Sequence, residues 1–299
     1  MFEKISEYNK KHRVEQKYTQ KTEDENFAVD ILTNLIQRLE EKKAYYDLKS
    51  TKSKSDMMRD KFLDLLKNNK IKFNGKIEGF RPTKDGQKTD GISFQSCIQT
   101  VDSLKPRFSE RTVEEEWWDS TIRPIFQEEI VREQARRQGL LVSSDEVSEW
   151  QIRSITGTEA VVYEDPQDKM KVLKIVKFFQ QEEPTFTEFC ERNIGFNIMF
   201  PATKYDLIRF AEKSNGSVQP ILRQNYVYGD ELKNLSSKEY DKFLEQYRND
   251  GYEIESISPG YAVIRYGGYE ASDLHNSNIL KGKDETYYVI DAFVEKITR

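Results

Sequence analysis

The sequence has few of the residue types that carry metal and redox chemistry. Its 299 residues include two cysteines, Cys97 and Cys190, and two histidines, His12 and His275. A structural zinc site takes about four Cys or His ligands at short, regular spacings, so this sequence excludes such a site. Two thiols that lie far apart, with no secretory leader before them, predict a protein of a reducing compartment.

The sequence also lacks a long apolar run. No stretch approaches the roughly 18 apolar residues of a membrane span, and the first residues do not form a signal peptide. We therefore expect a cytoplasmic protein with no membrane partner. The formal net charge is −5, which argues against nucleic acid as a partner. Aromatic residues make up 12% of the chain, enough to build a folded core.

The most informative pattern lies near the end of the sequence. Asp273 is followed by Asn278 five residues later, and Asp291 comes directly after the apolar run 287–290. Phosphoryl transfer needs such a set, because one carboxylate receives the proton of the acceptor hydroxyl while an amide and a carboxylate hold Mg²⁺ on the phosphates. The alternative is a polar turn between two strands, since Asp and Asn are common turn residues.

A second pattern lies about a hundred residues upstream. Gly157 opens one β-type run, and a polar turn at Asp165 leads into a second run that contains Lys174. Alternation places Lys174 on one face of the sheet between Val172 and Val176. A lysine in this setting is similar to the kinase strand lysine that binds the α- and β-phosphates. The simpler interpretation is a solvated lysine on an edge strand.

Taken together, these motifs resemble those of the protein-kinase-like superfamily. More narrowly, the intermediate segments 196–201, 205–207, 220–229 and 249–252 follow an order that resembles the compact kinase domains of polyvalent proteins. Such proteins are carried by phages and conjugative elements, that is, by mobile genetic elements. The resemblance covers roughly residues 150–296 and departs from the superfamily pattern in places. Ala271 and Ser272 replace the usual His-Arg before the catalytic Asp, and Asp291-Ala292-Phe293 keeps only the metal-binding carboxylate. Eight residues follow Asp291, with no peptide-binding segment, so the acceptor could be a protein or a small molecule.

The resemblance implies an α+β fold in two parts. We expect residues 1–147 to form a mainly helical N-terminal region of unknown role. Residues 148–299 would form a compact, truncated kinase-like nucleotide-binding domain, with an antiparallel sheet lobe and a small helical and catalytic-loop lobe. Helical spacing and caps predict a helix over 112–138, bent or broken at Pro124, and another over 236–250.

The resemblance also implies ATP and Mg²⁺ as cofactors and assigns a role to each site residue. Lys174 would hold the phosphates, and a helix that begins at Pro184 would supply its glutamate partner, for which we favour Glu188 over Glu191. Asp273 would be the catalytic base, and Asn278 and Asp291 would be the metal ligands. The nucleotide contacts would be Gly157, Lys174, Glu188, Gln224 and Tyr226. The backbone of the hinge after strand 219–228 would bind adenine.

The resemblance therefore predicts a Mg-ATP-dependent phosphotransferase that acts on a protein or a small molecule. The alternative is a non-catalytic pseudokinase that binds a nucleotide or a partner. The oligomeric state is not indicated.

Overall fold

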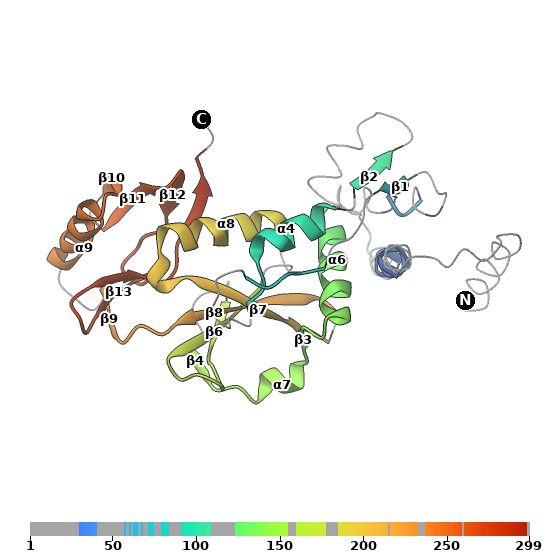
Figure 1. The fold of residues 1–299 in the computed structure, drawn as a ribbon, viewed down its shortest axis with the longest axis horizontal. Coiled ribbons are helices and arrows are strands. Elements are labelled where there is room, and N and C mark those ends of the chain that lie inside the picture. The colour runs from blue at the N-terminus through green and yellow to red at the C-terminus, as the bar shows by residue number, and fades with distance from the viewer. Residues whose placement is uncertain are drawn as a thin grey trace, which may run out of the picture.

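A large sheet forms the centre of the molecule, with its longer helices on one face, a short helix on the other and the C-terminal elements at one end (Figure 1). The computed structural model describes residues 30–40, 57, 60, 62–64, 67, 71–74, 79–83, 91–103, 105–108, 123–154, 160–177, 185–214, 216–232, 237–258 and 260–297. Among the helices of these ranges, none is both long enough and apolar enough to cross a membrane.

The large sheet has six strands in the order β3-β7-β8-β6-β5-β4. Their bounds are β3 (Leu141–Val142), β4 (Ile152–Ser154), β5 (Ala160–Glu164), β6 (Lys171–Val176), β7 (Tyr205–Glu212) and β8 (Val218–Asn225). All neighbours pair antiparallel except β3 and β7, which pair parallel. The hairpin predicted around Asp165 is confirmed as β5 and β6. The Asp165 side chain accepts a hydrogen bond from the Gln167 N–H at 2.8 Å, as expected for an Asp at a turn.

The register of this sheet brings three polar side chains to one face. Lys174 lies opposite Leu222, and Gln224 lies opposite Val172 on one side and Tyr205 on the other. Directly opposed residues of antiparallel strands point to the same face of a sheet. Lys174, Gln224 and Tyr205 therefore share a face, which helix α8 (Phe186–Met199) covers. A smaller apolar cluster on the other face packs against Val147 of helix α7 (Ser144–Ser148).

Helix α8 begins at a capping box. The Thr185 side chain accepts a bond from the Glu188 N–H, while the Glu188 carboxylate accepts one from the Thr185 N–H at 2.6 Å. Two backbone N–H groups that have no partner inside the helix are thereby bonded. The helix ends before the 3₁₀ turn η3 (Pro201–Thr203), because Pro201 cannot continue it.

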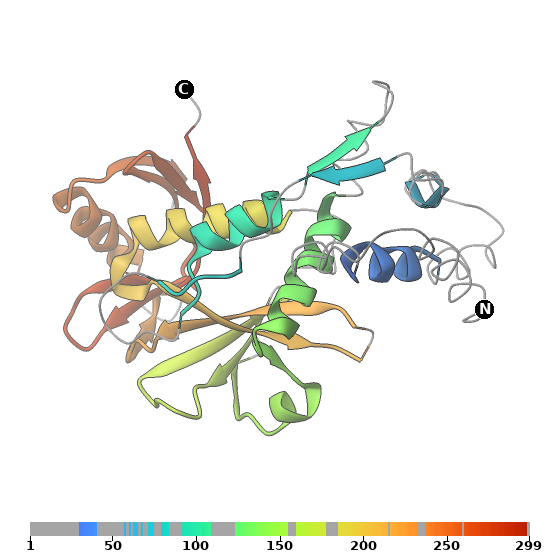
Figure 2. The ribbon, with the colours of Figure 1, turned by 45° about the vertical axis from the view of Figure 1, so that its right-hand side comes forward.

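Helices α4 (Phe94–Asp102) and α6 (Arg123–Arg137) pack near α8 (Figure 2). The predicted helix over 112–138 is confirmed from Arg123 onwards, and the earlier part lies outside the described residues. Pro124 lies in the first turn of α6, where its missing N–H is not needed. Ile125, Phe126 and Ile130 are buried in the core, as their helical spacing predicts. The strands β1 (Ile71–Asn74) and β2 (Lys105–Phe108) form a separate antiparallel pair.

The C-terminal elements are two further sheets and helix α9. Their bounds are β9 (Gly229–Glu231), α9 (Ser237–Asn249), β10 (Glu253–Ser258), β11 (Tyr261–Tyr266), β12 (Tyr269–Ser272), β13 (Ile279–Gly282), β14 (Tyr287–Val289) and β15 (Phe293–Lys296). One sheet has the order β10-β11-β12-β15 and the other the order β14-β13-β9. The predicted helix over 236–250 is confirmed as α9, which ends before Gly251 at φ +89°. Gly195 of α8 lies so close to the first sheet that an added Cβ would come within 2.6 Å of the Tyr269 ring.

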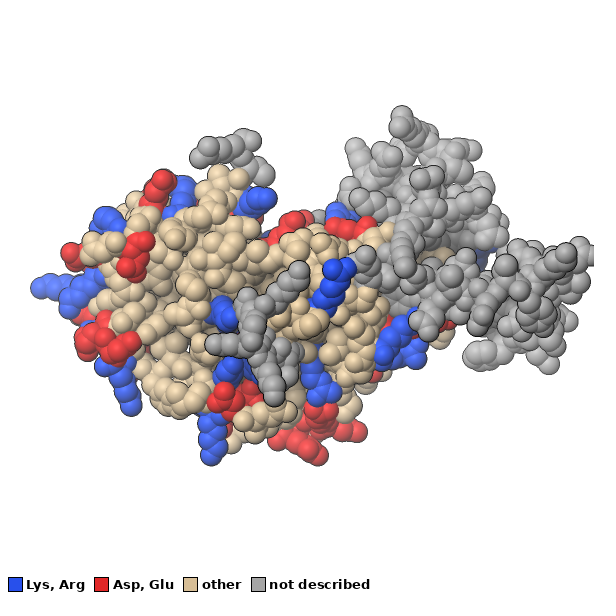
Figure 3. All heavy atoms as spheres, in the orientation of Figure 1, with Lys and Arg blue, Asp and Glu red and all other residues tan. Residues whose placement is uncertain are grey.

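One continuous hydrophobic core connects these parts. It runs from Ile31 and Leu35 of the helical segment 30–40, through α4, α6 and α8, to Val294 of β15. Upstream of residue 148, β3 also joins the large sheet through the pair Leu141–Phe210. The described part of the N-terminal region therefore shares its core with the sheet lobe, and the division at 147/148 stays a prediction. On the face drawn in Figure 3, basic and acidic side chains are interspersed.

Candidate functional site

Strand pairing brings the predicted catalytic base and the two predicted metal ligands to one end of the C-terminal sheets. Asp273 directly follows β12, and Asn278 directly precedes β13. Asp291 lies between β14 and β15. Because Ser272 pairs with Phe293 and Ile279 pairs with Val289, the loop 273–278 and the segment 290–292 lie side by side. The Ile290 N–H donates to the Asn278 carbonyl at 2.8 Å and closes this junction.

Asp273 has an uncommon backbone conformation that its neighbours hold in place. Its φ is +59°, in the left-handed region that residues other than glycine seldom adopt. The Asn278 amide nitrogen donates to the Asp273 carbonyl at 2.9 Å and approaches its Oδ2 at 3.4 Å. The side chain of Asp273 is 52% exposed. Its carboxylate is therefore held by the loop and still faces solvent, where an acceptor could reach it.

Three further contacts order the loop between Asp273 and Asn278. His275 accepts the Ser277 N–H at its Nδ1 (3.2 Å), and its Nε2 lies 3.7 Å from Oδ1 of Asp273. The neutral ring then carries its proton on Nε2, facing the carboxylate. Beneath the loop, the hydroxyl of Tyr240 on α9 donates to the Leu274 carbonyl at 3.0 Å.

Lys174 lies at the boundary between the large sheet and this loop. Its side chain is 10% exposed, and its ammonium donates to the Tyr205 hydroxyl at 2.7 Å and to the Ile290 carbonyl at 2.8 Å. Oδ2 of Asp291 lies 3.8 Å from the same nitrogen. Burial lowers the pKa of Lys174, and the attraction of Asp291 opposes that shift. The structure therefore brings Lys174 and Asp291 together, and Lys174 is not a solvated edge-strand residue.

The segment that leads to Asp291 is anchored by bonds to its carbonyls. The Ile290 carbonyl accepts from Lys174, from the Tyr205 hydroxyl (2.7 Å) and from the Gln224 amide nitrogen (3.2 Å). The Thr203 hydroxyl donates to the Val289 carbonyl at 2.5 Å, and Gln224 donates to the Thr203 carbonyl at 2.6 Å. Gln224 is 3% exposed, so its amide nitrogen belongs to this internal network. A nucleotide contact through Gln224 stays a prediction.

The expected ion pair between Lys174 and Glu188 is wrong for this structure. The Glu188 carboxylate accepts from the N–H and the hydroxyl of Thr185 at 2.6 and 3.0 Å, as the capping group of α8. Glu191 is exposed on the same helix. The Thr185-x-x-Glu188 spacing is the capping-box pattern, so the sequence carried the signal for this role. Tyr205, in contrast, was missed, because its contact with Lys174 depends on the pairing of strands that are distant in the sequence.

The hinge between β8 and β9 uses part of its backbone for internal bonds. The Tyr226 N–H donates to the Met170 carbonyl at 2.8 Å, and the Tyr228 carbonyl accepts the Lys283 N–H at 3.1 Å. Within the described chain, no backbone bond engages Val227, which lies between them. The Tyr226 ring lies 3.7 Å from the Arg153 guanidinium carbon. The Tyr226 N–H is thus already bonded within the protein, and a nucleotide contact of Tyr226 stays a prediction. The predicted contact Gly157 lies outside the described residues.

The donors at this site fit a magnesium ion that brings most of its own ligands. Among the described residues, no group of three or more His, Cys, Asp or Glu side chains could hold a metal. Asn278 commits its amide nitrogen to Asp273, which leaves its amide oxygen as an acceptor. Asp291 is 57% exposed. One amide and one carboxylate oxygen suit Mg²⁺, which keeps several waters and takes the rest of its ligands from substrate phosphates.

Comparison with known proteins agrees with this geometry. No curated protein matches the chain. The family described as "Serine/Threonine/Tyrosine Kinase found in polyvalent proteins" matches residues 126–298, which is more than half of the chain. The match begins in α6 and ends after β15, so it contains the large sheet, Lys174 and the junction of the two loops. The chain therefore belongs to the kinase family of polyvalent proteins.

Proposed function

We propose that this domain transfers the γ-phosphoryl group of Mg-ATP to a hydroxyl acceptor. One observation supports the proposal most strongly. The ammonium of Lys174 lies 3.8 Å from Asp291, and the Ile290–Asn278 bond joins the segment of Asp291 to the loop that carries Asp273. These contacts support a single site that would offer a cation for phosphate, two oxygen donors for a metal and an exposed carboxylate for the acceptor. Phosphoryl transfer depends mainly on positioning and electrostatic stabilisation by such a set.

In this proposal Asp273 is the catalytic base. Its carboxylate receives the proton of the acceptor hydroxyl as that oxygen forms a bond to the γ-phosphorus, while the bond to the bridging oxygen of ADP breaks. Lys174 holds the phosphates through its charge. Asn278 and Asp291 would hold Mg²⁺, which when bound neutralises charge on the phosphate oxygens. Asn278 has a second role, because its amide nitrogen fixes the backbone of Asp273.

A non-catalytic nucleotide-binding module is the second candidate function. It is favoured by the capping role of Glu188, because no glutamate of α8 pairs with Lys174 in the described structure. It is also favoured by the hinge, where the Tyr226 N–H is already bonded. A binder would still need Lys174 and the metal ligands, but it would have no use for an exposed Asp273.

Calorimetric titration of ATP with and without Mg²⁺ tests the first part of the proposal. We expect the wild type to bind ATP more tightly with Mg²⁺ and Lys174→Ala to weaken binding in both conditions. Transfer of labelled γ-phosphate to water, protein or small hydroxyl compounds tests the second part. Binding without any transfer would favour the non-catalytic module, and absence of binding would contradict both candidates.

A further inference from the structure

Tyr205 occupies the place at Lys174 where a helix glutamate was expected. Its hydroxyl is the acceptor of a 2.7 Å bond from the Lys174 ammonium. A lysine ammonium only donates, so the tyrosine hydrogen is free to bond the Ile290 carbonyl, 2.7 Å away. Lys174 bonds the same carbonyl at 2.8 Å. The three groups form a closed triangle that fixes the end of the lysine side chain.

The backbone of Tyr205 is in turn held by helix α8. The side chain of Asn197 accepts the Tyr205 N–H at 2.7 Å and donates to the Tyr205 carbonyl at 2.8 Å. The ring of Phe196, on the same helix, stacks on the Tyr205 ring with 4.5 Å between centroids. Tyr205 is 5% exposed, so its ring has little room to turn. Helix α8 therefore reaches Lys174 through Asn197 and Tyr205.

We infer that Tyr205, held by Asn197 of helix α8, is a positioning residue that aims the Lys174 ammonium at the phosphates. The inference rests on the proposed function, and it assigns to a neutral phenol the role expected of a glutamate. Burial, with a contribution from Asp291, raises the pKa of Tyr205 well above its ordinary value, so the phenol stays neutral. A neutral acceptor orients the ammonium without cancelling its charge, which remains available to a nucleotide.

The first test measures Lys174 in the nucleotide-free protein. The rate at which an amine-reactive ester acylates Lys174 is followed against pH by mass spectrometry in the wild type and in Tyr205→Phe, which keeps the ring. Loss of an acceptor to the charged form should move the midpoint of labelling down by about one pH unit. Tyr252→Phe is the matched control, since it removes a tyrosine bond to the Met199 carbonyl at the end of α8. It should leave the midpoint unchanged.

The second test measures Mg-ATP binding and melting temperature in the same variants. Tyr205→Phe should weaken binding about tenfold or more, the scale of a lost bond to a charged group. Asn197→Ala should also weaken binding, although it keeps the Tyr205 hydroxyl. Tyr252→Phe should bind Mg-ATP as the wild type does. Because Asn197→Ala reports on the same link, the inference can be tested even where Tyr205→Phe does not fold.

The outcomes separate this inference from the proposed function. If Lys174 is labelled with the same midpoint in Tyr205→Phe as in the wild type, the inference is overturned, whatever happens to ATP binding. Weakened binding in Tyr252→Phe equal to that in Tyr205→Phe would also overturn it, because loss of packing would then be the cause. A wild type that binds no Mg-ATP would contradict the proposed function, and a shifted midpoint would still support the bond between Tyr205 and Lys174.

Discussion

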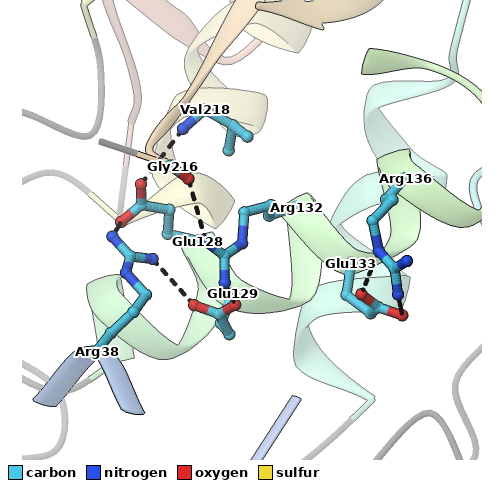
Figure 4. Close-up of polar contacts among 8 residues, drawn as sticks. All are labelled: Arg38, Glu128, Glu129, Arg132, Glu133, Arg136, Gly216 and Val218. Atoms are coloured by element: carbon cyan, nitrogen blue, oxygen red, sulfur yellow. Dashed lines mark hydrogen bonds and ion pairs between the residues drawn. The ribbon is translucent and has the colours of Figure 1, made fainter. Parts of the chain in front are cut away.

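Two clusters of charged residues in this protein differ in how far their carboxylates are exposed to solvent. In the first, Glu128 and Glu129 of α6 have side chains that are 6% and 0% exposed, and Arg38 of the segment 30–40 bonds both at 3.0 and 2.9 Å (Figure 4). Glu128 also accepts the Val218 N–H. In the second cluster, Asp273 and Asp291 are 52% and 57% exposed.

The first cluster behaves as a closed structural network. Arg132 contacts Glu129 and donates to the Gly216 carbonyl, while Arg136 bonds Glu133 at 2.8 and 2.9 Å. Burial alone would lower the pKa of Arg38, but the adjoining carboxylates raise it above its ordinary value, so the guanidinium stays charged. Every buried carboxylate named here has a cation beside it, as buried charges require.

The second cluster has the opposite pattern of burial. Its cation, Lys174, is buried and its carboxylates face solvent. The nearest approach of opposite charges is 3.8 Å, longer than the bonds of the first network. In the first cluster, buried carboxylates are paired with cations inside the protein. In the second, which we propose to be a ligand site, the carboxylates are left exposed, where a metal and phosphates could complete them.

The largest effect expected in the second cluster is that of Asp291→Ala. The substitution removes the exposed carboxylate of the proposed metal ligands, so phosphate transfer should fall to background and Mg²⁺ should no longer enhance ATP affinity. The melting temperature should change little, because the side chain is 57% exposed. Calorimetry with and without Mg²⁺ measures the effect. Unchanged Mg²⁺-dependent binding would remove Asp291 from the site.

Among substitutions that break an ion pair of the first cluster, Arg38→Ala should lower the stability most. It leaves two buried carboxylates without their shared cation, which typically costs about 3–5 kcal/mol. Chemical denaturation measures the loss. Lys67→Ala is the matched control, because Lys67 pairs with Glu40 of the same helical segment with both side chains at least 40% exposed, and should cost no more than about 1 kcal/mol. Equal losses in the two variants would contradict the comparison.

The pH dependence of ATP binding should follow the lowered pKa of Lys174. The protonated ammonium binds phosphate, so affinity should fall as the pH rises through that pKa. Because burial lowers the pKa, the affinity should begin to fall below the pH at which an ordinary lysine titrates. Above the pKa of Lys174, the affinity should fall by at most about tenfold per pH unit. Lys174→Arg provides the check, since arginine keeps its charge and should lose this limb of the profile.

Glu188→Ala should have the smallest effect, and only on stability. Loss of the capping box should cost about 1 kcal/mol of unfolding free energy, with ATP affinity unchanged. Glu188→Gln preserves the pattern of the box and should recover most of that loss. A marked fall in ATP affinity in both variants would show that Glu188 pairs with Lys174 in the nucleotide-bound protein after all.

The sequence predicted the parts of this site that depend on local order. Lys174 could be placed on its strand by alternation, and α9 could be recognised by its cap, its apolar face and Gly251, because these signals lie within a few neighbouring residues. The ion pair expected between Glu188 and Lys174 is absent from the described structure, where Glu188 takes the capping role that the local spacing also indicated. A nucleotide contact of Glu188 stays a prediction. Tyr205 and the Ile290 carbonyl could not be predicted. Their contacts with Lys174 span 31 and 116 residues and depend on strand pairing and on a backbone atom that every residue has.

Arg38 shows the same limit in the N-terminal region. Its partners Glu128 and Glu129 lie 90 and 91 residues away, and nothing in the local pattern distinguishes it from a solvated helix residue. The burial of Glu129 was equally hidden, because glutamate is usually exposed. The structure shows that α6 buries both its apolar face and these acids.

Single-turnover transfer of labelled γ-phosphate in Asp273→Asn tests whether the exposed Asp273 is the catalytic base that we propose. The proposed function predicts that transfer slows by about 10²-fold or more, while Mg-ATP affinity stays within a few-fold of the wild type. Asp284→Asn is the matched control, an exposed carboxylate in the turn between β13 and β14, and should transfer phosphate as the wild type does. Equal transfer rates in the wild type and Asp273→Asn would contradict the claim.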